Sequence, residues 1–386
     1  MKNKNNKEES SMGKQKILYL VEAFGGGVYT YMQSLANRLC DEYDIVIAYS
    51  MRPQTPLDFK KYFNENIKFI EVKNFTRSIG KKDLSAVLEV RKIVKEEKPD
   101  IVHVHSSKAG IIGRLAITDK KIKMFYTPHG YSFLKQDDSK LKRSFYKYTE
   151  KMAAMYKRDC TTIACSYGEY KEGLKIYKNC DYVNNGIDMK EIDSVKLEKN
   201  DGNKIRVCTV GRIDIQKNPE LFNKIAEKFP NVDFVWIGDG WKKDLLTSSN
   251  IQITGWKTRQ ETLQEVAKCD IFLLPSIWEG LPMSLLEAMY LEKPCVVSNI
   301  SGNNNVIKNG INGFICDDLT NYYDAINNII LKKCNTEEIC MNAKKSIINE
   351  FNIDSMSRKY SEVYKRYSLQ GEEKQNEENR DSIVLF

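Results

Sequence analysis

Short runs of apolar and β-branched residues alternate with longer stretches of helical periodicity along the whole chain. In the first half the runs are Ile17–Val21, Ile45–Ala48, Ile67–Val72, Ile101–Val104, Lys123–Tyr126 and Thr161–Ala164. The second half repeats the pattern at Ile205–Val210, Val232–Ile237, Ile251–Thr254, Ile271–Leu274 and Pro294–Ser298. Strands that alternate with helices indicate parallel sheets covered on both faces. We therefore predict an α/β fold with two doubly wound, Rossmann-like domains that face a cleft.

The boundary between the two halves is expected in Asp188–Lys204, which is charged and poor in apolar residues. This predicts a first domain over residues 14–187 and a second over residues 188–350. A last amphipathic helix is expected at about Asp354–Tyr367, within a segment of residues 351–368. The two ends, residues 1–13 and 369–386, are polar and are expected to be disordered.

Composition narrows the class of protein. The 386 residues are 41% hydrophobic and 29% charged, which is enough apolar material for two buried cores. No apolar run approaches the length of about 18 residues that a membrane span needs, and no signal peptide is expected. The ten cysteines include no Cys-x-x-Cys pair and none lies beside a histidine, which excludes the usual zinc spacings. A cytoplasmic protein is expected.

The net charge of +8 is confined to one half of the chain. Residues 1–190 carry 35 Lys and Arg against 23 Asp and Glu, whereas the remainder carries 25 against 29. The stretch Lys140–Arg158 combines apolar residues at helical spacing with basic ones; they are Leu141, Phe145, Tyr148, Met152 and Met155, and Lys140, Lys142, Arg143, Lys147, Lys151, Lys157 and Arg158. We expect the apolar stripe to pack on the sheet and the basic residues to meet an anionic membrane, which predicts peripheral association.

Ligands of open parallel sheets bind beyond the carboxyl ends of the strands, so the residues that follow each strand are informative. Gly25-Gly26-Gly27 follows the first strand and precedes a helix predicted at Tyr29–Leu39, an arrangement suited to an anion. All three histidines of the chain also lie at strand ends. His129 is expected in the cleft, with His103 or His105 shaping its wall. No carboxylate accompanies them, which disfavours a metal site.

The second half places cations at the same edge. Arg212 follows the first strand of that half, and Lys217 lies five residues later at the start of a helix. A guanidinium binds phosphate oxygens in a fork, and an ammonium group adds a point charge. Gly238 opens a Gly-Asp-Gly turn after the next strand. Together these groups suit a nucleotide diphosphate.

Two carboxylates flank a further helix start. Glu279-Gly280-Leu281 precedes a helix that carries Glu287. Pro282 suits the first position of this helix, and the N–H groups of Met283 and Ser284 are expected to be free to meet a phosphate. Carboxylates accept hydrogen bonds from hydroxyls, so this pair indicates a sugar and a ribose. Helix capping and a surface ion pair are the alternative for the two glutamates.

These motifs resemble the family-4 retaining glycosyltransferases of the GT-B type. The strongest similarity is Ser276–Met289, in which Glu279 and Glu287 are separated by seven residues. Further similar blocks follow in the same order as in the family: Asn185–Asp188, Gly211-Arg212, Gln216–Pro219, Gly238–Gly240 and Thr254–Trp256. Val102–Gly110 and Thr127–Gly130 resemble the branch that synthesises bacterial capsules and exopolysaccharides.

The resemblance implies roles for these residues. The first domain would bind an acceptor, the second a nucleotide-sugar, and the last helix would cross back onto the first domain. Arg212 and Lys217 would hold the donor pyrophosphate, Glu287 the ribose and Glu279 the donor sugar, with His129 beside the transferred sugar. The remaining donor-binding residues would be Gly238, Gly280, Leu281, Met283 and Ser284. Gly25, Gly26, Gly27 and His105 would form the acceptor side. Where the family often has a glutamate, this chain has Asn305, which is therefore left out of the site.

The implied reaction transfers a sugar from a nucleotide-diphosphate-sugar, with a UDP-sugar favoured, to a polyprenyl-diphosphate-linked saccharide. No metal and no cofactor besides this co-substrate is implied. A related enzyme that uses a soluble acceptor, or a sugar-nucleotide epimerase, is the first alternative. A nucleic-acid-binding protein is the second; scattered Lys and Arg residues without an aromatic-rich motif disfavour it, so no nucleic-acid partner is predicted.

Overall fold

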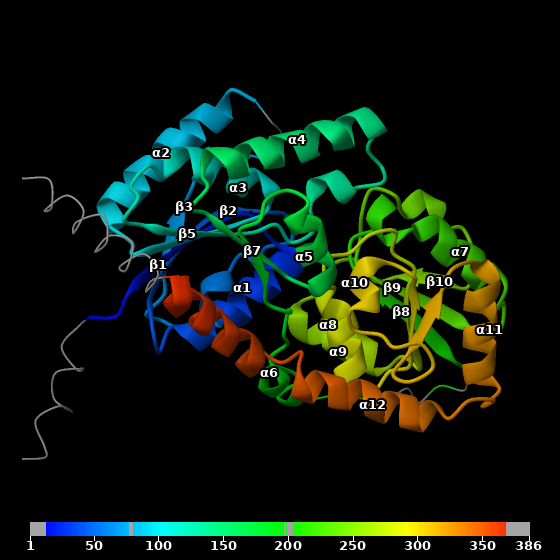
Figure 1. Cartoon of the computed structure of the whole chain (residues 1–386). Coiled ribbons are helices and arrows are strands. Elements are labelled where there is room, and N and C mark those ends of the chain that lie inside the picture. Colours follow the sequence, from blue (N-terminus) through cyan, green and yellow to red (C-terminus); the bar gives the residue numbers. More distant parts are fainter. Residues whose placement is uncertain (1–12, 77–79, 197, 199–201, 203, 368–386) are drawn as a thin grey trace, which may run out of the picture.

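The computed structural model describes residues 13–76, 80–196, 198, 202 and 204–367, and within these the chain forms two parallel sheets (Figure 1). In spatial order the first sheet contains β3 (Lys68–Glu71), β2 (Asp44–Met51), β1 (Lys16–Phe24), β4 (Ile101–His105), β5 (Lys123–Thr127), β6 (Thr161–Ala164) and β7 (Cys180–Tyr182). The second contains β10 (Ile251–Ile253), β9 (Asp233–Ile237), β8 (Arg206–Val210), β11 (Ile271–Leu274), β12 (Cys295–Ser298) and β13 (Phe314–Cys316). The predicted fold class is confirmed.

Two strands were not predicted, β7 and β13. Each is three residues long and lies at the edge of its sheet. The sequence of β7, Cys180-Asp181-Tyr182, contains no apolar run, and its three side chains are only partly buried. β13, Phe314-Ile315-Cys316, is apolar throughout, but a run of three residues is too short to be recognised as a strand.

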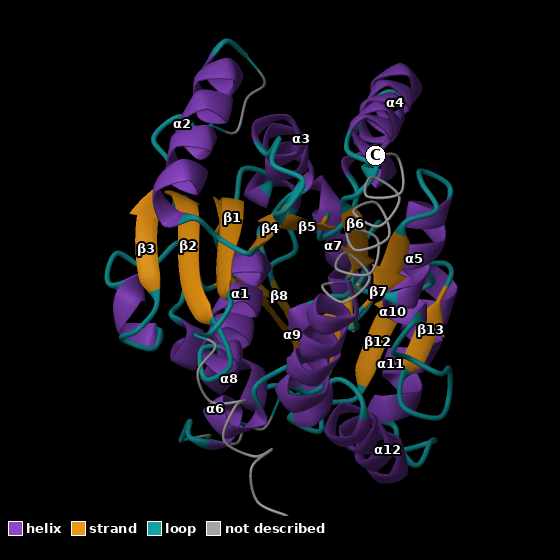
Figure 2. Cartoon of the chain, turned by 60° about the vertical axis from the view of Figure 1, so that its left-hand side comes forward, coloured by secondary structure: helices purple, strands orange, loops and turns teal. Residues whose placement is uncertain are grey.

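Helices cover both faces of each sheet. On the first sheet, α2 (Lys82–Glu97), α3 (Ser107–Ala116) and α4 (Lys140–Tyr156) lie on one face and α1 (Gly26–Leu39) on the other (Figure 2). On the second sheet, α7 (Pro219–Glu227) and α11 (Leu319–Ile330) share one core, and α8 (Arg259–Ala267), α9 (Met283–Tyr290) and α12 (Thr336–Asn349) share the other. The short helices α5 (Tyr167–Leu174), α6 (Met189–Asp193) and α10 (Ser301–Asn304) lie in connections between the longer elements.

The last helix, residues 353–367, returns from the second domain to the first, as predicted (Figure 1). Met356, Tyr360, Val363 and Tyr364 are buried in the core that β1 and α1 form. Buried aromatic side chains contribute strongly to such a core. The ends predicted to be disordered, residues 1–13 and 369–386, lie outside the described residues except for Gly13.

Helix α1 begins at Gly26, three residues before the predicted start. Gly26 has a φ of +55°, a value that glycine adopts readily, so the glycine run forms the first turn of the helix. The N-terminal N–H groups of α1 therefore belong to the glycine run itself.

The orientation of α4 contradicts the prediction. Only Glu150 and Ala154 of this helix are buried, whereas Leu141 is 83% exposed and Phe145 55%. The buried carboxylate of Glu150 lies 3.0 Å from Nη1 of Arg114 and accepts a hydrogen bond from the Tyr126 hydroxyl. Polar contacts thus hold the inner side of α4, and its apolar stripe faces outward. Lys157, predicted to face lipid, is buried and pairs with Asp159.

Candidate active site

A cleft of about 530 Å³ lies between the two domains. Its lining includes, among others, thirteen of the fourteen site residues predicted from the sequence: Gly25, Gly26, Gly27, His129, Arg212, Lys217, Gly238, Glu279, Gly280, Leu281, Met283, Ser284 and Glu287. The carboxyl ends of both sheets thus supply one continuous site. The exception is His105.

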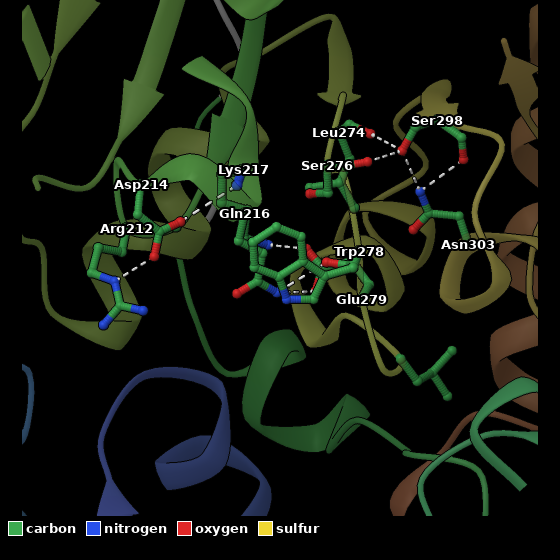
Figure 3. Close-up of polar contacts among 12 residues, drawn as sticks. Arg212, Asp214, Gln216, Lys217, Leu274, Ser276, Trp278, Glu279, Ser298 and Asn303 are labelled. Carbon is green, nitrogen blue, oxygen red and sulfur yellow. Dashed lines mark hydrogen bonds and ion pairs between the residues drawn. The ribbon is translucent and has the colours of Figure 1, made fainter. Parts of the chain in front are cut away.

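The cations on the wall of the second domain are held by the loop that follows β8 (Figure 3). Nε of Arg212 donates to Asp214 at 2.7 Å, while its two terminal nitrogens make no hydrogen bond with a described residue. Lys217 ends a short 3-10 helix, Ile215–Lys217. A Cβ atom on Gly238 would lie 2.2 Å from the carbonyl oxygen of Gly211, so this approach of two loops requires glycine. The terminal nitrogens of Arg212 are available to an anion.

Glu279 and Lys217 form one unit rather than two separate groups. The ammonium of Lys217 lies 2.7 Å from Oε1 of Glu279, and the amide of Gln216 donates to Oε2 at 3.2 Å (Figure 3). Both charged side chains are largely buried. The predicted sugar-binding carboxylate is therefore in direct contact with the predicted phosphate-binding ammonium.

Helix α9 begins directly after this loop. Pro282 precedes the helix and Met283 is its first residue, one position later than predicted. The N–H groups of Met283 and Ser284 lie in the first turn, so they have no partner within the helix. The loop before α9 is held by Ser298, whose hydroxyl donates to the carbonyl oxygen of Ser276 at 2.5 Å (Figure 3). The N-terminal end of α9 thus presents N–H donors to the cleft.

Glu287 is buried in the cleft wall and neither caps a helix nor forms a surface pair. Its Oε1 lies 2.6 Å from Nη1 of Arg259, a residue of α8. The other side of the guanidinium binds Glu191 at 3.2 Å, and Gln33 of α1 donates to Glu191 at 3.4 Å. Sequence reasoning missed Arg259, because it follows a helix cap rather than a strand. This network connects the predicted ribose carboxylate to the first domain.

On the wall of the first domain, His129 has a φ of +53° and Gly130 one of +90°. Glu169, which sequence reasoning also missed, is buried and accepts from the N–H of Gly130 at 2.5 Å and from that of Cys165 at 2.8 Å. Desolvation raises the pKa of Glu169, and these two hydrogen bonds oppose the rise. Glu169 holds the loop that presents His129.

His105 was predicted on the acceptor side, but it is fully buried. Its Nδ1 atom lies 3.0 Å from Nε2 of His129, so it stands behind that ring and cannot contact an acceptor. Strand alternation places His103 and His105 on the same inner face of β4. The prediction for His105 is therefore wrong.

Asn305, which was left out of the site, lies at a contact between the domains. Its Oδ1 accepts from the N–H of Gly168 in α5 at 3.1 Å. A Cβ atom on Gly168 would lie 1.9 Å from the hydroxyl of Ser301, so the side chains of Ser301 and Asn305 pack directly against this glycine. This contact holds α5 against α10 beside the cleft.

Two family models match consecutive parts of the chain. Glycosyltransferase Family 4 matches residues 25–191, and Glycosyl transferases group 1 matches residues 189–368. The chain belongs to the family-4 glycosyltransferases.

Relatives of this glycosyltransferase include bacterial glycosyltransferases. The UDP-Gal:alpha-D-GlcNAc-diphosphoundecaprenol alpha-1,3-galactosyltransferase of Escherichia coli is 29% identical over 78% of this chain and 85% of its own. The capsular polysaccharide biosynthesis glycosyltransferase CapM of Staphylococcus aureus is 26% identical over 82% and 89%. Anabaena HepE in complex with UDP has a TM-score of 0.71 and 17% identity, with 91% and 100% coverage. This last likeness concerns the fold, which is GT-B.

Cationic groups of this glycosyltransferase gather along the cleft. Arg212, Lys217 and Arg259 line the cleft, together with the N-terminus of α9. Within the described part of the chain, no three His, Cys, Asp or Glu side chains are grouped so that they could hold a metal ion. Cationic side chains and helix N–H groups can stabilise charge that develops on a leaving oxygen.

Proposed function

We propose that this glycosyltransferase moves a sugar from a nucleotide-diphosphate-sugar, with a UDP-sugar favoured, to a polyprenyl-diphosphate-linked saccharide. The new bond would keep the configuration of the donor, and no metal would take part. The observation that supports this best is the cleft, which places Arg212, Lys217 and the start of α9 opposite His129. The reaction would serve bacterial surface polysaccharide or oligosaccharide synthesis.

Each wall of the cleft would have a separate task. Arg212, Lys217 and the first-turn N–H groups of α9 would stabilise the leaving diphosphate. Glu287 would accept hydrogen bonds from the ribose, and Glu279 from the donor sugar. Burial lowers the pKa of His129 to about 3, so its ring would act as a neutral hydrogen-bonding group beside the transferred sugar.

The Escherichia coli relative supports this choice of acceptor, because that enzyme acts on a diphosphoundecaprenol-linked sugar. In this chain the Gly25–Gly27 loop lines the cleft on the side of the first domain and ends in the N-terminus of α1. Backbone N–H groups of such a loop suit the anionic part of an acceptor. We therefore assign the acceptor side to this loop.

Thermal unfolding in the presence of UDP-, GDP- and ADP-sugars tests the donor. A ligand at 100 times its Kd adds about 2.7 kcal/mol of stability, so a UDP-sugar should raise Tm by several degrees. The Arg212→Ala/Lys217→Ala variant should show a much smaller rise at the same concentration. A rise in Tm with GDP- or ADP-sugars only would exclude a UDP-sugar as the donor. No rise in Tm with any of these sugars would contradict the proposed function.

The same proposal includes a membrane partner. The protein would be cytoplasmic and would bind peripherally at the inner face of the cell membrane. Among the described residues, no helix is long and apolar enough to span a bilayer. Helix α4 instead turns Leu141, Phe145 and Tyr148 outward, between the exposed Lys142 and Lys147. Helix α2, which lies on the same face of the first sheet with α3 between it and α4 (Figure 2), also exposes Leu84 and Leu88. Apolar side chains between lysines suit the surface of an anionic membrane.

Vesicle co-sedimentation across a salt series tests this association. At low salt the protein should bind vesicles of phosphatidylglycerol, because each basic residue near the surface contributes about 1 kcal/mol. Phe145→Ser should weaken binding at every salt concentration. The control Met341→Ser removes a similarly exposed apolar group from the second domain and should change nothing. Failure to bind anionic vesicles at low salt would contradict the membrane association and favour a soluble acceptor.

A further inference from the structure

Three histidine rings lie in a row that runs from the cleft into the core of the first domain. The ring centroids of His129 and His105 are 5.2 Å apart, and those of His105 and His103 are 4.1 Å apart. Desolvation lowers the pKa of all three imidazoles, that of His129 to about 3 and those of the other two well below the usual value. At neutral pH each ring therefore carries one N–H group and one lone pair.

The innermost ring has a defined tautomer. The hydroxyl of Thr127 donates its only proton to the carbonyl oxygen of Ile163 at 2.7 Å. Toward Nε2 of His103, at 2.9 Å, that hydroxyl can only accept. His103 thus carries its proton on Nε2, and its Nδ1 accepts from the hydroxyl of Tyr364 at 2.7 Å. The last helix, which carries Tyr364, thus lies at the inner end of this row of rings.

The two outer rings share one proton between Nδ1 of His105 and Nε2 of His129, which lie 3.0 Å apart. Nε2 of His105 is buried and has no hydrogen-bond partner among the residues that the structure describes. If His129 were the donor, His105 would have to carry its proton on this Nε2, as a buried N–H group without a partner. The large majority of buried side-chain polar groups in folded proteins have a hydrogen-bond partner. The arrangement in which His105 donates leaves only a lone pair unpartnered.

We propose that His105 is a positioning residue that donates its Nδ1–H to His129 and thereby fixes His129 as the Nδ1–H tautomer. The hydrogen bond to one ring nitrogen sets the protonation of the other. Since Nε2 of His129 is occupied by this bond, the nitrogen left for the cleft is Nδ1, which then presents an N–H donor. The partner would be an oxygen of the donor sugar or its diphosphate, so this part of the inference rests on the proposed function.

Neighbouring side chains keep the ring of His129 in place for this bond. The ring of Tyr31 stands edge-on to His129 with centroids 4.6 Å apart, and its hydroxyl donates to Tyr360 at 2.5 Å. Glu169 holds the loop on the other side through the N–H of Gly130. The orientation of His129 is thus set from both sides, while His105 alone bonds its inner nitrogen.

Nitrogen NMR of the full-length protein labelled with ¹⁵N-histidine tests the assignment directly. The chain has three histidines, so each pair of ring nitrogens can be assigned by single substitutions. At neutral pH, Nδ1 of His129 should appear protonated and Nε2 unprotonated. The opposite pattern would overturn the proposal. This measurement needs no substrate and no turnover.

Two substitutions of His105 separate positioning from packing. In His105→Leu, Nε2 of His129 loses its hydrogen bond, so the ring is no longer held in place, and kcat should fall about tenfold or more with little change in the KM for the donor. In His105→Asn, an amide N–H can replace the Nδ1–H, so the tautomer and most of kcat should be kept. Unchanged kcat in His105→Leu, or a loss in His105→Asn as large as in His105→Leu, would overturn the positioning role. If the unmodified enzyme transfers no sugar, the proposed function fails, while the spectrum still decides the tautomer.

Discussion

Replacing Lys217 with methionine should lower the affinity for UDP and for the UDP-sugar about ten- to a hundredfold. The ammonium lies on the cleft wall, and charge-assisted hydrogen bonds contribute about 1.5–3 kcal/mol. Arg212→Ala should have a similar effect, because its terminal nitrogens are available to the same phosphates. Isothermal titration with UDP measures both. A folded Arg212→Ala/Lys217→Ala variant with unchanged affinity would refute the pyrophosphate assignment.

The pairing of Lys217 with Glu279 calls for two controls. Lys217→Met leaves the carboxylate of Glu279 buried without its ammonium, which could disturb the loop rather than the phosphate contact. In the Lys217→Met/Glu279→Gln variant this charge is removed as well, and the loss of UDP affinity should persist. Lys224→Met removes an exposed ammonium from α7, where it pairs with Glu220, and should leave the affinity unchanged. Recovery of UDP affinity in the Lys217→Met/Glu279→Gln variant would attribute the loss to the loop.

Most of the fold could be predicted because its central strands are fully buried. A strand such as Ile271–Leu274 has no polar residue and appears in the sequence as a continuous apolar run. Helix α4 shows where this reasoning fails. Its stripe from Leu141 to Met155 has the spacing of a core-facing helix, yet the buried side is held by Glu150 and Arg114. Periodicity detects an apolar face but does not tell whether protein or another surface covers it.

The candidate site was predictable as far as its residues follow strands. Arg212 and His129 come directly after β8 and β5, and the topology brings them to one cleft. Arg259 and Glu169 belong to helices, and their partners Glu287 and Gly130 are 28 and 39 residues away along the chain. No local sequence pattern indicates such a pair of residues. The same holds for His105, whose spacing from His103 gives the strand face but not its depth behind His129.

Glu279→Gln and Glu287→Gln should separate binding of the sugar from binding of the nucleotide. Glu279 lies in the loop before α9 and pairs with Lys217, whereas Glu287 lies on the helix and pairs with Arg259. Removal of one group that stabilises a transition state costs about a hundred- to a thousandfold in rate. We therefore expect Glu279→Gln to lower kcat with the full donor by about a hundredfold and to change the affinity for bare UDP by less than about threefold.

Glu287→Gln should instead lower the affinities for UDP and for the UDP-sugar together, by about tenfold each, because the ribose is common to both ligands. Arg259 keeps its ion pair with Glu191 in this variant, so the fold should be retained. Glu220→Gln, on the exposed side of α7, is the control for loss of a carboxylate. Titration with UDP and turnover with the full donor decide between the roles. If both cleft variants lose affinity for bare UDP to the same extent, Glu279 contacts the nucleotide and the assigned roles are wrong.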